Sequence, residues 1–240
     1  MQNSDDPKPV AIENRRPSWI GLVILGLVVS CVSWGVLQWK YPFFKVGDEF
    51  SIGMGAPNEA RQALLAEQAR VNGWNAAVVL AIAGGLLAGG LAVAARPCCP
   101  AVVRAMVGLV IGAAWGGGVG LVGASLFAAL MPSDTLPGPA HVGLAQAMVM
   151  GVLGCGVGGV YGMFFKQPTA FAAGGLGGAL GGAVGGVLYP IVAGLIFPSQ
   201  GTTEFIAAGA SVRGLWLALP LVAIALAAPW ACAKQKSSTQ

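Results

Sequence analysis

Charged side chains are scarce in this chain: Asp, Glu, Lys and Arg together make up 9% of its 240 residues. Soluble domains carry roughly 25%, so a water-exposed surface of ordinary composition is excluded. Hydrophobic residues make up 56% of the sequence, and the mean hydropathy is +0.75. The composition therefore predicts an all-α membrane protein that crosses the lipid bilayer several times.

Basic residues are also few and dispersed. The 13 Lys and Arg side chains lie in the tails and loops of the predicted protein. No run of them alternates with aromatic residues, as a nucleic-acid-binding surface would require. Nucleic acid is therefore excluded as a partner, and the net charge of +4 is interpreted as a signal of membrane topology.

The residues that carry most enzyme and metal chemistry are nearly absent. The one histidine, His141, stands at the start of an apolar segment, and the five cysteines include no CxxC pair. No Asp, Glu, Lys, Arg or His lies inside the apolar segments, where pumps and proton relays need such a residue. Ser125 lacks a histidine within a helix to activate it. We therefore expect no catalytic residue, no metal and no cofactor, and we expect that the protein is not an enzyme.

The adjacent Cys98 and Cys99 lie between two prolines. Neighbouring cysteines are poorly placed for a structural disulfide. A lipidated or redox-active pair is one interpretation, and two inert thiols is the simpler one.

Glycine, in contrast, is abundant, and it is patterned. Two sets of four glycines recur every fourth residue inside apolar runs, and such a set shares one face of a helix. We call them the first ridge (Gly108, Gly112, Gly116, Gly120) and the second ridge (Gly174, Gly178, Gly182, Gly186). The pattern is typical of a glycine zipper, where a neighbouring backbone approaches closely. We expect the two ridges to pack against each other or against a symmetry mate.

Trp115 is the one large ring close to the first ridge. It could plug a pore or a ligand site. The interpretation we favour is that the indole fills a hole left by glycines on a neighbouring helix. Trp115 and the eight ridge glycines are the predicted helix-packing residues.

Apolar segments of spanning length occur six times, which gives both termini the same side of the membrane. The predicted spans are 18–39, 74–95, 105–131, 142–165, 169–197 and 214–232. The remaining segments are predicted as a disordered cytoplasmic tail (1–17), an extracytoplasmic loop with a short surface helix (40–73), an interfacial loop (198–213) and a cytoplasmic tail (233–240).

The long loop 40–73 contains the run NEARQALLAEQARV, which is rich in good helix formers. Glu67 and Arg70 are spaced for a weak side-chain pair on such a helix. The helix could be a separate surface element or an extension of the span that follows. Its apolar face is too weak to decide between the two.

An internal repeat is suggested by the spacing of the ridges. Each glycine of the second ridge lies 66 positions after its counterpart in the first, and Pro132-Ser133 maps onto Pro198-Ser199 by the same shift. The pattern predicts a duplicated two-helix hairpin. Because a two-helix unit preserves direction, the copies would be parallel, unlike the inverted repeats of many transporters.

The distribution of basic residues predicts the orientation. Placing both termini in the cytoplasm puts eight Lys and Arg residues inside: Lys8, Arg15, Arg16, Arg96, Arg104, Lys166, Lys234 and Lys236. Five lie outside: Lys40, Lys45, Arg61, Arg70 and Arg213. The expected location is a cell inner membrane.

The function that these features favour is that of a non-enzymatic scaffold or accessory subunit. Its glycine ridges would pack its own bundle or an oligomer, and its partner would be a second copy or another membrane protein. The alternative is a channel or facilitator for an uncharged or lipidic substrate, because a path lined by Gly, Ala and Ser passes no charge readily.

Overall fold

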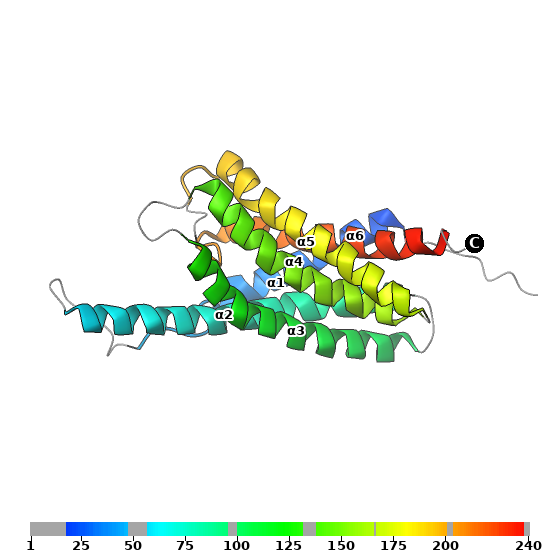
Figure 1. Cartoon of the computed structure of the whole chain (residues 1–240), viewed down its shortest axis with the longest axis horizontal. Helices are drawn as coiled ribbons and strands as arrows, with labels where there is room; N and C mark the ends of the chain where they lie inside the picture. The colour runs from blue at the N-terminus through cyan, green and yellow to red at the C-terminus, as the bar shows by residue number, and fades with distance from the viewer. Residues whose placement is uncertain are drawn as a thin grey trace, which may run out of the picture.

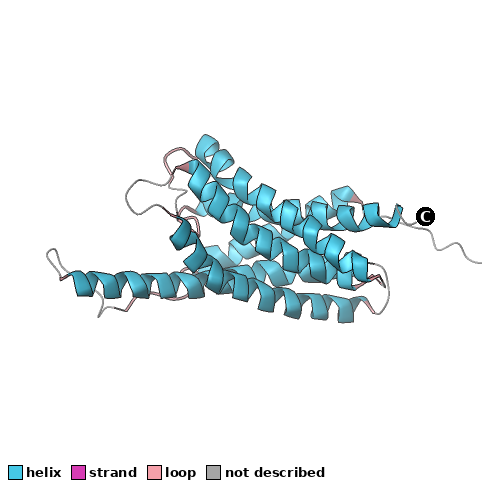
Figure 2. Ribbon diagram, in the orientation of Figure 1, coloured by secondary structure: helices cyan, strands magenta, loops and turns pink. Residues whose placement is uncertain are grey.

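The structure, a computed structural model, describes residues 18–47, 57–95, 100–131, 138–165, 167–200 and 204–237. Within these ranges it consists of α-helices joined by loops (Figures 1 and 2). The helices are α1 (Trp19–Lys40), α2 (Asn58–Ala94), α3 (Ala101–Leu130), α4 (Pro139–Met163), α5 (Pro168–Ile196) and α6 (Ala210–Ser237). All six are long and apolar enough to cross a membrane, which confirms the predicted all-α membrane class.

Two antiparallel hairpins form most of the bundle. Helices α2 and α3 make one, α4 and α5 make the other, and α6 and then α1 pack alongside (Figure 1). The centre is filled by large apolar side chains that are less than 2% exposed, among them Leu80, Leu87, Leu153, Leu221 and Ile224. Because six helices alternate in direction, the start of α1 and the end of α6 lie at the same end of the bundle.

Helix α2 is longer than any bilayer requires. Its 37 residues rise about 55 Å, against a hydrocarbon core of about 30 Å. Its first part projects beyond the other helices (Figure 1), and we call residues 58–73 the α2 extension. The short surface helix expected within 40–73 is therefore not separate, because no proline or turn interrupts the run into Trp74. The Glu67–Arg70 pair is confirmed: two guanidinium nitrogens donate to the carboxylate, each at 2.8 Å.

The first ridge lies against α2. A Cβ built on any of its four glycines would fall closer than 3.0 Å to a backbone carbonyl oxygen of α2. The carbonyls belong, in ridge order, to Ala88, Gly84, Leu80 and Ala76. Helix α3 thus approaches α2 at backbone distance, and any side chain on this face would have to separate the two helices.

The second ridge lies against α4 in the same way. Its four glycines meet, in order, the carbonyls of Gly158, Gly154, Met150 and Gln146, again closer than 3.0 Å from a built Cβ. Helices α3 and α5 share no contact among the described residues. The expectation that the ridges contact each other is therefore wrong within the chain. Each ridge instead meets the helix before it, which a short connection holds adjacent.

Helix α5 carries a further row of glycines that the sequence reading did not separate from the second ridge. A Cβ on Gly177 or Gly181 would lie 2.6 Å or 2.5 Å from the carbonyl oxygen of Ala227 or Ala223 on α6. Gly185 accommodates Pro220, which lies inside α6. Helix α5 therefore presents backbone to a neighbour on two faces.

The two hairpins are built alike, with one difference. The ridge glycines of α3 and α5 correspond at 66 positions, whereas their contacts on α2 and α4 correspond at 70, as Leu80 does to Met150. The four-residue difference is about one helical turn. In both hairpins the glycine face of the second helix thus packs against the first helix. The contacting residues of α4 lie one turn further along the sequence than the repeat in α3 and α5 would place them.

Two arginines belong to the first turns of helices, because α3 and α6 begin earlier than expected. Arg104, predicted to precede its span, is 5% exposed, and its guanidinium donates to the carbonyls of Ala92 and Ala95. These carbonyls end α2, where no further amide can reach them. Arg213 lies buried in the first turn of α6 at the other end of the bundle.

We expect that replacing Gly178 and Gly182 together by Leu weakens the α4–α5 hairpin. Overpacking costs about 1 to 3 kcal/mol per site, while Leu itself favours membrane insertion. The variant should reach the membrane in normal amounts and unfold at a lower temperature in detergent. Gly194→Leu on the same helix is the control, because nothing lies within 4 Å of its added Cβ. Equal thermal stability of the two variants would contradict the close contact.

Candidate functional site

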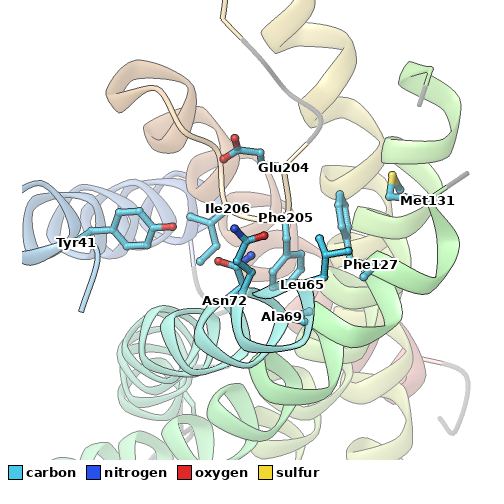
Figure 3. A pocket seen from close by; sticks show the side chains of 12 residues that line it. Tyr41, Leu65, Ala69, Asn72, Phe127, Met131, Glu204, Phe205 and Ile206 are labelled. Atoms are coloured by element: carbon cyan, nitrogen blue, oxygen red, sulfur yellow. The ribbon is translucent and has the colours of Figure 1, made fainter. Parts of the chain in front are cut away.

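A cavity of about 330 Å³ opens where the α2 extension leaves the end of α3 (Figure 3). The extension contributes one wall and the last turns of α3 another, and the segment before α6 and Tyr41 complete it. The lining residues are Tyr41, Leu65, Gln68, Ala69, Asn72, Ala124, Phe127, Ala128, Met131, Glu204, Phe205 and Ile206. The cavity therefore lies at the end of the bundle from which the extension projects.

The segment before α6 is folded into the bundle. The interfacial loop expected over 198–213 differs here, because Phe205, Ile206 and Ala207 are all buried. The Phe205 ring lies 5.3 Å from that of Phe127 and 6.4 Å from that of Trp216, between centroids. Burial against these aromatic partners stabilises the side chains of this segment more than a position along the membrane surface would.

A buried amide fixes this segment. Gln146 of α4 is fully buried, and its Nε2 donates to the carbonyl oxygen of Phe205 at 2.9 Å. The Nε1 of Trp216, equally buried, donates to Gln146 Oε1 at 3.1 Å. The sequence analysis missed this cluster, although Gln146 is the one amide side chain in the predicted span 142–165. A buried amide within an apolar run needs partners, and that was the available signal.

Arg213 contacts two parts of the chain that line the cavity, the segment before α6 and Tyr41. Its Nε and Nη2 donate to the carbonyls of Ala207 and Ala208 at 2.9 Å and 2.6 Å. Its guanidinium carbon lies 4.4 Å from the centre of the Tyr41 ring. Burial raises the pKa of Tyr41, Arg213 opposes the rise and Glu204 adds to it. The phenol is therefore neutral near pH 7.

Tyr41 is positioned by a polar contact outside the cavity. Asn75 of α2 is 2% exposed and holds both backbone groups of Phe44. The Phe44 amide donates to its Oδ1 at 2.9 Å, and its Nδ2 donates to the Phe44 carbonyl at 3.0 Å. The chain that follows α1 is thus fixed to α2, and Tyr41 is held at the cavity wall.

The lining of the cavity contains few reactive side chains. Its only ionisable lining groups are Glu204 and the Tyr41 phenol, and no histidine or cysteine is among them. A nucleophile beside a base, the usual arrangement for covalent catalysis, does not occur in this lining. Among the described residues no three or more His, Cys, Asp or Glu side chains are grouped so that they could hold a metal.

The predicted helix-packing residues lie away from this cavity. The eight ridge glycines are inside the hairpins, as described above. Trp115 reaches from α3 to α4, where its Nε1 donates to the carbonyl of Val152 at 2.9 Å and its ring covers Gly156. Cys98 and Cys99 lie outside the described residues.

Comparison with protein-family models, with curated proteins and with solved structures found no match to this chain. The class of protein is therefore defined by the fold: a multi-pass membrane protein whose described residues form six apolar helices, with an open cavity at an end of the bundle.

We expect Gln146→Leu to destabilise the protein, because it leaves the Trp216 N–H and the Phe205 carbonyl without their partner. A buried polar group that loses its partner costs about 1 to 3 kcal/mol. Thermal unfolding in detergent measures the loss, and Met150→Leu, one turn further along α4, is the apolar control. In combination with Trp216→Phe the cost should be less than additive. Strict additivity would show that the two side chains are not coupled.

Proposed function

We propose that this protein is a non-enzymatic scaffold or accessory subunit of a membrane assembly. The observation that carries the proposal is the way in which the bundle is filled. Both glycine ridges are packed against helices of the same chain. The centre of the bundle is occupied by Leu and Ile side chains that are less than 2% exposed. Such a bundle is suited to hold its shape while its outer surfaces bind partners.

The same filling weighs against the alternative, a channel or facilitator. A solute path requires space along the whole bundle. The cavity ends at Phe205 and Phe127, whose rings are packed against each other and are 8% and 5% exposed. Gln146 and Trp216, which both contact Phe205, are fully buried. These side chains support a scaffold over a channel within a single chain.

The α2 extension is the element that we assign to partner binding. Its 16 residues rise about 24 Å, which takes its tip past the headgroup region of a bilayer. The side chains of Arg61, Gln62 and Gln68 are exposed along it, and acidic and basic residues alternate. An exposed helix of mixed charge at this height suits the soluble surface of another membrane protein better than it suits lipid.

The orientation is part of the proposal. Eight of the 13 basic residues fall on the side of the termini, and the positive-inside tendency then favours cytoplasmic termini in a cell inner membrane. The extension would project on the opposite, extracytoplasmic side.

One labelling experiment tests both the side of the membrane on which the α2 extension lies and whether it binds a partner protein. Asn58→Cys, at the tip of the extension and in a background without native cysteines, is treated in intact cells with an impermeant maleimide that carries a photo-crosslinker. We expect labelling and, after illumination, a discrete protein adduct. Ala101→Cys, exposed at the start of α3, is the control and should react only after the membrane is opened.

Reaction of Ala101→Cys alone in intact cells would reverse the orientation. Labelled Asn58→Cys without any adduct, together with solute flux through liposomes that contain the purified protein, would replace the scaffold by the channel.

A further inference from the structure

We propose that the cavity beside the α2 extension binds an amphiphile that carries a primary ammonium group. Its apolar chain would lie between the extension and α3, and its ammonium would be held at Glu204. The inference concerns a ligand site and does not depend on the scaffold proposal.

The walls of the cavity suit an apolar chain. Leu65, Ala69, Phe127, Met131 and Ile206 are among its lining residues, and Figure 3 shows Leu65 and Phe127 at the same cavity as Phe205. Leu65 is 63% exposed although it is a large hydrophobic residue. A volume of about 330 Å³ lies within the range of small-molecule sites, about 300 to 1,000 Å³. Covering these walls would remove apolar surface from water.

The charge at the opening selects a cation. Glu204 is the only carboxylate in the lining and is exposed, with no ion-pair partner in the described part of the chain. The nearby cation Arg213 is turned to the carbonyls of Ala207 and Ala208 and to the Tyr41 ring. An anionic head would be repelled by Glu204, and a neutral head would leave its charge unmatched.

The polar lining favours a primary ammonium over a quaternary one. Gln68 and Asn72 of the extension line the same cavity as Glu204, which lies on the segment before α6. Figure 3 shows Asn72 and Glu204 at this cavity. Their amide oxygens and the carboxylate are acceptors, and a primary ammonium offers three N–H donors. A quaternary ammonium carries the same charge but has no N–H to donate.

Such an amphiphile has two sources: a membrane lipid with an amine headgroup, or a soluble amphiphilic amine. The cavity lies at the end of the bundle, beside the last turns of α3 and next to Tyr41, which follows α1, so that either could enter it. The chemistry of recognition is the same for both.

The test uses the full chain in phosphatidylcholine nanodiscs, with hexylammonium as the probe. We expect saturable binding by calorimetry that is tighter than that of hexyltrimethylammonium and of hexanol, and no binding of hexanoate. Glu204→Gln should weaken hexylammonium binding roughly fivefold, as the loss of one partly exposed charge pair implies. Its unfolding temperature without ligand should not change. Glu67→Gln is the matched control, because that carboxylate is paired with Arg70 and does not line the cavity.

Ala69→Phe, which adds a ring to the wall, should abolish binding of hexylammonium. The proposal is overturned if the four probes bind alike, if hexylammonium does not saturate, or if Glu204→Gln binds it as tightly as the natural chain. Nanodiscs that contain phosphatidylethanolamine identify the source. Competition with hexylammonium there supports a lipid headgroup as the occupant, and unchanged affinity supports a soluble amine.

Discussion

The contact on which this structure depends is that between a glycine Cα and the carbonyl of a neighbouring helix. In a bilayer, helices gain little from hiding apolar surface from each other, because lipid tails are as apolar as Leu. Helices in a bilayer are therefore held together mainly by the dispersion energy that they gain when their backbones approach closely. The first and second ridges provide this approach in the two hairpins, and α5 provides it again towards α6 through Gly177 and Gly181.

The two hairpins are built alike but pack differently against the helix that follows each of them. Trp115 on α3 and Gly181 on α5 occupy corresponding positions, and each faces the helix that follows in the chain. The indole of Trp115 spans to α4 and covers Gly156, whereas Gly181 lets the backbone of α6 approach α5 directly. The second hairpin is thereby joined closely to α6, while α3 diverges from α2 near its end and leaves room for the cavity.

Much of the fold could be predicted from hydropathy and glycine spacing, because both are local properties. The six spans were located within a few residues of the observed helices, apart from the long start of α2. The partners of the ridges could not be predicted in this way, since the spacing shows which face is bare but not which helix covers it. The candidate site depends on contacts distant in sequence, such as that of Gln146 with Phe205 and Trp216. No periodicity reveals such contacts.

The central claim, that each ridge closes its own hairpin, can be tested most directly by disulfide trapping in the membrane. A Cβ on Gly117 would lie 3.7 Å from that of Ala81, and a Cβ on Gly151 would lie 3.6 Å from that of Ala183, both within disulfide geometry of about 3.5 to 4.5 Å. In a background without native cysteines, G117C with A81C and G151C with A183C should each form a bond within one chain. The pair G117C with A183C, which joins α3 to α5, should not. Efficient trapping of that third pair, with failure of the first two, would contradict the account.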